Sequence, residues 1–182
     1  KSELIQYTNS VLRTTQKYIC VSRPRRFGKS MAANMLTAYY SRGCDSREMF
    51  QGLKIAKHTG FEEHLNQYNV IHLNMRDYLT ESENMKQLIQ FVEEDLLDEL
   101  QQEFADLRMP RRRTLVKVLE QAFAQYKIPF VFIIDEWDCI FRVHKSDAAS
   151  QKTYLDFLRN LLKDKSYIAL AYMTGILPIK KY

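Results

Sequence analysis

The sequence predicts an α/β protein, a three-layer αβα sandwich in which helices cover both faces of a mainly parallel central sheet. Short apolar runs of strand length alternate with longer segments in which apolar residues recur every three or four positions. The short runs are almost continuously apolar, which is typical of parallel strands buried on both faces. The expected strands cover residues 18–22, 70–74, 130–134 and 168–173.

Helical periodicity fills the intervals between these runs. Apolar residues spaced by three and four predict helices over 85–100 and 115–126, and further helices near 4–12, after residue 30, and over 151–162. We expect Thr80 and Glu83 to form a capping box before the helix at 85–100, because the hydroxyl and the carboxylate can satisfy unpaired backbone N–H groups.

Length and composition fit one folded domain. With 182 residues, of which 46% are hydrophobic, the chain can bury one core, and we expect a single domain over 1–182 with residues 43–68 as an elaboration. The 27% of charged residues and the few glycines and prolines exclude disordered and collagen-like classes. No apolar run approaches the roughly 20 residues of a membrane helix, so we expect no membrane partner.

The cysteines indicate the cellular compartment, and the charged residues indicate the kind of ligand. Cys20, Cys44 and Cys139 are widely spaced and form no CxxC pair, which favours the cytoplasm. The net charge of +5 is concentrated in two basic clusters that could attract the phosphates of a nucleotide or a nucleic acid. For the second cluster, a solvated helix face is the competing interpretation. The clusters are Arg23, Arg25, Arg26 and Lys29, and Arg108, Arg111, Arg112, Arg113 and Lys117.

The segment after the first expected strand has the order of a phosphate-binding loop. A strand ending at residue 22 is followed by Gly28-Lys29-Ser30 and then by a helix. In such a loop, backbone N–H groups surround the phosphates and the helix N-terminus adds partial positive charge. Lys29 would reach the β- and γ-phosphates, Ser30 would bind Mg²⁺, and Gly28 would allow close backbone approach.

Neighbours of this loop extend the expected nucleotide site. Arg25, Arg26, Phe27 and Met31 are the further candidate contacts. The usual motif begins with glycine, and Arg23 stands at that position here. The competing interpretation is that Gly-Lys-Ser simply opens a helix, as small polar residues often do.

A second candidate element follows the third expected strand. Asp135 could orient Mg²⁺ and Glu136 could hold or deprotonate the attacking water. A carboxylate is costly to bury without a partner, although both acids could instead face solvent in a loop. We expect Lys29 and Asp135 to converge on one metal–triphosphate from adjacent strand tips. Thr174, near the end of the last strand, would touch the γ-phosphate or the water, or cap the strand end structurally.

With these residues in hand, the sequence resembles the bacterial AAA-ATPase-like family of P-loop proteins. The resemblance spans essentially the whole chain and rests on residues 22–30, 133–138 and 174–176. It implies a P-loop NTPase fold of the AAA/ASCE type, ATP and Mg²⁺ as cofactors, and hydrolysis of ATP to ADP and phosphate. In this family the arginine-rich loop without its first glycine looks like the ordinary form. Trp137 stands where tyrosine is usual.

The same resemblance implies a longer protein. Family members continue past the last expected strand and often carry a C-terminal nuclease-like domain of the PD-(D/E)XK type. We therefore expect this chain to be truncated after its fourth core strand, without the helical lid or the nuclease-like domain. Lid residues or a neighbouring subunit often supply an arginine finger, which is compatible with a homo-oligomer.

These features support three hypotheses of function. The first is an ATP-binding domain with Mg-dependent hydrolysis coupled to conformational change. The alternative is a catalytically weak nucleotide- or nucleic-acid-binding module that uses the arginine-rich loop. A small-molecule P-loop kinase would need an acceptor site and an arginine-bearing lid, and the sequence has no signature of such a lid.

Overall fold

The computed structural model describes residues 2–177, and the chain divides into two compact units. One unit, here called the sheet unit, is built from Lys1–Asn74, Ile128–Asp138 and Ile168–Tyr182. The other, called the helical unit, is built from Met75–Lys127 and Cys139–Tyr167. The expected single domain stays a prediction.

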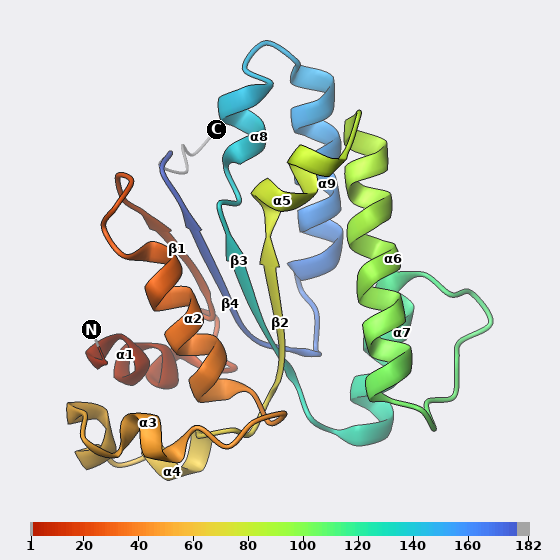
Figure 1. Cartoon of the computed structure of the whole chain (residues 1–182). Coiled ribbons are helices and arrows are strands. Elements are labelled where there is room, and N and C mark those ends of the chain that lie inside the picture. The colour runs from red at the N-terminus through yellow and green to blue at the C-terminus, as the bar shows by residue number, and fades with distance from the viewer. Residues whose placement is uncertain (1, 178–182) are drawn as a thin grey trace. The chain divides into compact units, whose positions relative to one another are not determined.

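The sheet unit contains a four-stranded sheet in which every pairing is parallel (Figure 1). Its order is β1-β4-β3-β2. The predicted α/β class, with a parallel sheet flanked by helices, is confirmed and is consistent with a P-loop-like sandwich. The strands are β1 (Tyr18–Ser22), β2 (Asn69–Asn74), β3 (Phe130–Asp135) and β4 (Ile168–Gly175).

The expectation that Lys29 and Asp135 extend from adjacent strand tips is wrong. Strand β4 lies between β1 and β3 and pairs with both of them. The burial of the strands explains this order. Strand β4 is buried along almost its whole length, whereas β1 is partly exposed. A continuously apolar strand loses most contact with water between two neighbours, and a partly polar strand tolerates the edge.

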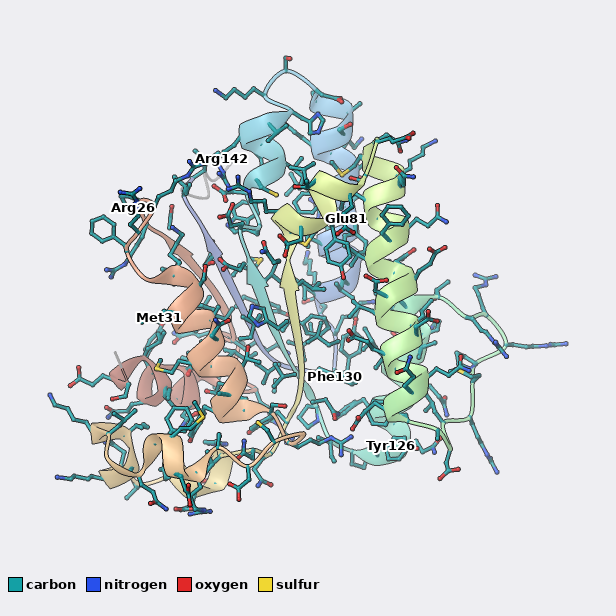
Figure 2. The ribbon with its side chains drawn as sticks, viewed as in Figure 1. Arg26, Met31, Glu81, Tyr126, Phe130 and Arg142 are labelled. Carbon is teal, nitrogen blue, oxygen red and sulfur yellow. The ribbon has the colours of Figure 1, made fainter. Side chains whose placement is uncertain are left out.

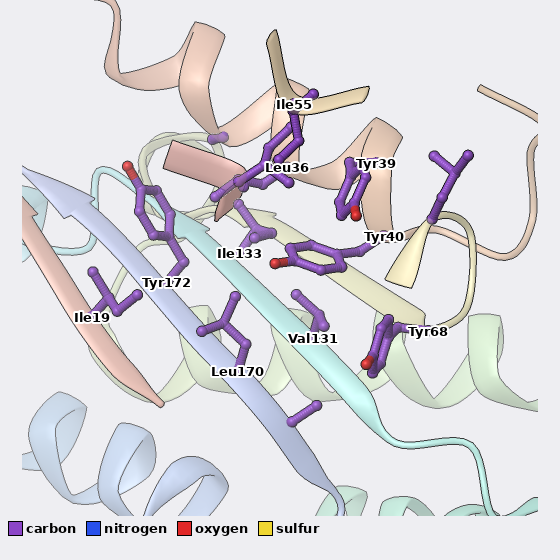
Figure 3. Close-up of a cluster of buried hydrophobic side chains, with 14 of the residues drawn as sticks. Ile19, Leu36, Tyr39, Tyr40, Ile55, Tyr68, Val131, Ile133, Leu170 and Tyr172 are labelled. Atoms are coloured by element: carbon purple, nitrogen blue, oxygen red, sulfur yellow. The ribbon is translucent and has the colours of Figure 1, made fainter. Parts of the chain in front are cut away.

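Helix α2 (Lys29–Tyr40) packs along one face of this sheet, against β2, β3 and β4. Its buried side chains meet apolar residues of the strands and of α1 (Glu3–Val11) in one core cluster (Figure 3). The buried phenols keep their hydrogen bonds, since Tyr40 Oη donates to Asn9 Oδ1 at 2.7 Å and Tyr39 Oη donates to the carbonyl of Phe61 at 2.7 Å. The face of the sheet that contributes to this core is therefore the face that α2 covers.

Residues 43–68 lie between α2 and β2, and their interpretation as an elaboration on the core stays a prediction. This segment contains the short elements α3 (Arg47–Gln51), η1 (Lys54–Lys57) and α4 (Phe61–His64). Each element buries one apolar side chain, namely Phe50, Ile55 and Phe61. All three side chains belong to the core cluster of the sheet unit.

The helical unit contains the two long predicted helices, with their expected starts. Within it, α6 packs against α5, α7 and α9. The helices are α5 (Met75–Glu81), α6 (Met85–Glu103), α7 (Leu115–Tyr126), α8 (Cys139–Val143) and α9 (Ala148–Leu162). Over residues 2–177, none of the helices combines the length and the apolar character that crossing a membrane requires.

The predicted capping box at Thr80 and Glu83 is wrong. Thr80 lies inside α5, and its hydroxyl donates to the carbonyl of Arg76 at 2.9 Å. The cap of α6 is Asn84, whose side chain accepts the N–H of Gln87 at 3.1 Å. The Gln87 side chain in turn accepts the N–H of Glu83, the residue before the cap, at 2.6 Å. Helix α5, which was not among the expected helices, already contains Thr80.

Candidate functional site

The loop between β1 and α2 is held at both of its ends. The N–H of Arg23 donates to the carbonyl of Gly175 in β4 at 3.1 Å. At the other end, Gly28 caps α2 with φ 73° and ψ 30°, a left-handed conformation in which a side chain would cause strain. Its carbonyl accepts the N–H of Ala32 at 3.1 Å and so starts the helix.

The ammonium group of Lys29 closes this loop on itself. Lys29 Nζ donates to the carbonyl of Arg23 at 3.0 Å and to the carbonyl of Pro24 at 2.9 Å. The side chain therefore links the end of the loop to its beginning. Because an ammonium group has three N–H donors, one remains for a ligand.

Positive charge accumulates at the loop and at the start of α2. No side chain caps α2, and its first turn contains no acid, so its first N–H groups can bind an anion. Arg25 and Arg26 are exposed, and within residues 2–177 neither has an ion-pair partner. Figure 2 shows Arg26 at the tip of the loop and Met31 on α2, where Met31 is 61% exposed.

The pleat of the sheet places Asp135 and Thr174 on the face that α2 covers. Ile133 in β3 and Tyr172 in β4 belong to the core cluster that includes α2 residues. Side chains two positions apart in a strand share a face, so Asp135 and Thr174 point to the same side. Both residues lie at the carboxyl ends of their strands, the edge at which the loop also begins.

Lys29 and Asp135 therefore occupy one edge and one face of the sheet. With neighbouring strands about 4.8 Å apart, the tips of β1 and β3 are roughly 10 Å apart across β4. Electrostatics agree with this proximity. Burial raises the pKa of Tyr172 to about 12, while Arg23 acts to lower this pKa and Asp135 to raise it, so both charges are felt at one phenol.

Asp135 is 5% exposed and is held through one of its two oxygens. Its Oδ1 accepts the hydroxyl of Thr174 and the N–H of Glu136, the latter at 2.9 Å. Among the described residues, no hydrogen bond ends on Oδ2. Thr174 is fully buried, and its side-chain hydroxyl makes a structural hydrogen bond with Asp135. Its contact with a nucleotide stays a prediction.

The residues after Asp135 include a second buried acid whose role the sequence left open. Asp138 is fully buried, and its Oδ2 accepts the N–H groups of Ile176 at 2.9 Å and of Leu177 at 2.7 Å. Glu136 lies between the two aspartates in a left-handed conformation, with φ 51°. The sequence signal for Asp138 was the presence of a third acid so soon after a buried strand. A buried carboxylate needs hydrogen-bond donors, so such an acid is expected to bind N–H groups nearby.

A pocket of about 240 Å³ adjoins the loop within the sheet unit. Leu4, Val21 and Tyr172 contribute walls that were not among the expected site residues, since no local motif marks them. The residues that line the pocket are Leu4, Val21, Arg23, Phe27, Gly28, Lys29, Ala32 and Tyr172. Over residues 2–177, no group of three or more His, Cys, Asp or Glu side chains is arranged to hold a metal ion.

An α/β fold with a parallel sheet and a glycine-lysine loop between its first strand and the following helix is consistent with the P-loop-like class of proteins. The chain belongs to the AAA-ATPase-like family, since the family model, described as a predicted AAA-ATPase, matches residues 2–182. The expected family is thereby confirmed, and membership supports ATP binding by this chain. No curated protein matches the chain.

Proposed function

We propose that this chain binds MgATP at the carboxyl edge of its sheet and hydrolyses it to ADP and phosphate, coupled to conformational change. The main support is that Lys29 and Asp135 lie at one edge and on one face of the sheet. The cation-rich loop can bind an anion, and Asp135 has an oxygen available for a cation. MgATP provides both the anion for the loop and the cation for Asp135, and it is present in the cytoplasm, the expected compartment.

Each residue of the site has a defined role in this proposal. The third N–H of Lys29 and the first N–H groups of α2 hold the β- and γ-phosphates. Asp135 Oδ2 and the exposed Ser30 hydroxyl hold Mg²⁺. Two protein ligands are enough, because Mg²⁺ in such sites is bound by one or two carboxylates, substrate phosphates and water. Bound Mg²⁺ neutralises charge that develops on the phosphates.

Glu136 is the residue that orients the attacking water and accepts its proton. Glu136→Gln is expected to leave the Kd for MgATP within about twofold and to lower the rate of phosphate release by about 10²- to 10⁴-fold. Titration calorimetry and a phosphate-release assay measure the two quantities. Glu83→Gln, at an exposed acid of the helical unit, is the matched control. Unchanged phosphate release by Glu136→Gln would remove Glu136 from this role.

The alternative function is a nucleotide- or nucleic-acid-binding module without significant turnover. Arg25 and Arg26 favour it, because both are exposed, neither has an ion-pair partner among residues 2–177, and they could contact an external polyanion. Binding of single- or double-stranded DNA without nucleotide, weakening steeply as salt is raised, would support this alternative. Phosphate release that depends on Glu136 would exclude it.

The pocket beside the loop is the proposed site for the nucleobase. Its walls include Leu4 and Tyr172, and among the described residues that line it none has a carboxylate to accept the N–H groups of guanine. Leu4→Asn is expected to weaken ATP binding roughly tenfold, since about 1.4 kcal/mol of apolar contact would be lost. Inorganic tripolyphosphate, which has no base, should bind both proteins equally. Both affinities can be measured by titration calorimetry.

The control for this test is Leu12→Asn, which changes a partly buried leucine at the other end of α1. It should leave both affinities unchanged. An equal loss of ATP and tripolyphosphate binding in Leu4→Asn would argue against a base in this pocket. It would leave the phosphate site itself intact as a proposal.

A further inference from the structure

The segment after β3 is attached to the segment after β4 by contacts that the proposed nucleotide site does not use. The N–H of Trp137 donates to the carbonyl of Thr174 at 3.1 Å. The carboxylate of Asp138 accepts the N–H groups of Ile176 and Leu177. Residues 135–138 therefore hold residues 174–177 at several successive points beyond the regular strand pairing.

Asp138 contributes most to this attachment. A fully buried carboxylate loses its hydration, and the loss is large unless hydrogen-bond donors replace the water. Two backbone N–H groups at 2.9 and 2.7 Å provide this replacement, and bonds to an ionised acceptor are about twice as strong as neutral ones. Asp138 is thus an internal anchor for the chain that leaves β4.

The anchor fits tightly against Gly175. A Cβ atom added at Gly175 would lie 2.8 Å from Asp138 Oδ1, 2.8 Å from Trp137 Nε1 and 2.9 Å from Asp138 Cγ. These distances are shorter than van der Waals contact. The side chains of Trp137 and Asp138 therefore rest directly on the backbone of β4, and the two segments cannot slide past each other without breaking this fit.

Glu136 lies between the points that are held. Its φ of 51° is a left-handed conformation that is unfavourable for a residue with a side chain. Such a conformation persists where the surroundings impose it. On one side, Asp135 is held by the hydroxyl of Thr174, and on the other side, Trp137 and Asp138 are held to β4 and its exit.

We propose that Asp138 is a positioning residue for Glu136. By anchoring the turn after β3 to the exit of β4, Asp138 keeps Glu136 in the conformation that directs its carboxylate at the attacking water. Asp138 itself does not touch the nucleotide. This inference rests on the proposed hydrolysis of ATP.

The test compares three variants of the whole chain. Asp138→Ala removes the anchor, Asp138→Glu displaces the carboxylate by one methylene, and Asp138→Asn keeps an oxygen that can accept the two N–H groups. The Kd for MgATP, the kcat of phosphate release and the melting temperature are measured for each. Asp98→Ala, at an exposed acid of α6, is the control for loss of a carboxylate.

We expect Asp138→Ala and Asp138→Glu to lower kcat at least tenfold while the Kd for MgATP changes by less than about twofold. Asp138→Asn should keep most of the wild-type kcat. Trp137 is the single tryptophan of the chain, so its fluorescence reports the anchor directly. Its emission should shift in Asp138→Ala and stay near the wild-type value in Asp138→Asn.

Three results would overturn the inference. Wild-type kcat in both Asp138→Ala and Asp138→Glu would show that Glu136 does not depend on the anchor. A joint loss of affinity, kcat and melting temperature would assign Asp138 a purely structural role. If Asp138→Ala does not fold, Asp138→Glu decides between these results. If the wild-type chain binds MgATP but releases no phosphate, both the proposed hydrolysis and this role of Asp138 are rejected. If the wild-type chain releases phosphate but the variants do not show the expected changes in kcat, only the role of Asp138 is rejected.

Discussion

Replacing Lys29 by alanine is expected to weaken the binding of MgATP by about 100-fold or more. The ammonium group would make charge-assisted hydrogen bonds to the phosphates, each contributing about 1.5–3 kcal/mol. A loss of about 3 kcal/mol corresponds to a factor of roughly 100 in Kd. The variant also removes the donor that joins the carbonyls of Arg23 and Pro24, so the loop loses its internal link. Titration calorimetry with MgATP measures the change.

The matched control is Lys86→Ala. Lys86 is exposed and lies in the first turn of α6, as Lys29 lies in the first turn of α2. Its removal should leave the Kd unchanged. Equal affinities of the wild-type chain, Lys29→Ala and Asp135→Ala would be incompatible with the proposed nucleotide site.

Replacing Gly175 by alanine is expected to destabilise the protein by about 1–3 kcal/mol, the usual cost of extra atoms in a packed interior. The new methyl group would meet atoms of Trp137 and Asp138 at 2.8 to 2.9 Å, and both side chains are buried, with Asp138 also held by two backbone N–H groups. In a protein of this size, each kcal/mol lowers the melting temperature by about 2–4 °C. Circular dichroism on heating measures the shift.

The control for this substitution is Gly52→Ala. No atom lies within 4 Å of a Cβ added at Gly52, and its φ of −81° suits any residue. The control should melt at or slightly above the wild-type temperature, because alanine reduces the entropy of the unfolded chain. A Gly175→Ala protein as stable as Gly52→Ala would show that the turn after β3 moves aside without cost, which would also weaken the positioning role of Asp138.

Much of the local structure could be predicted because it depends on short-range patterns. The five apolar residues of 130–134 lie in β3, whose six residues are all buried. The stripe in 115–126 is α7, with the same bounds. In both cases, the pattern of apolar residues along the chain predicts which side chains are buried, and tertiary packing does not override it. The prediction of a capping box at Thr80 was wrong because α5, which contains Thr80, has no clear apolar stripe by which it could be predicted.

The candidate site was predictable as a set of residues but not as an arrangement. Lys29 and Asp135 could be selected because each follows a recognisable strand, and the ends of parallel strands meet at one edge. The strand that lies between them could not be predicted, because the order of the sheet depends on which of the four strands are buried most completely. The pocket wall formed by Leu4 and Tyr172 was missed for a related reason, since these residues become neighbours only when α1 packs beside the sheet unit's strands.

The sequence by itself determined the α/β class, the expected strands, the loop that ends in Gly28-Lys29-Ser30 and the acids that follow β3, because these depend on residue type and spacing within a few positions. Only the tertiary structure decided that β4 lies between β1 and β3, that Thr174 holds Asp135, and that Asp138 anchors Ile176 and Leu177. The physical reason is that a buried polar group must find its partner in three dimensions. The partner of Asp135, for example, is Thr174, which is 39 residues away in the chain.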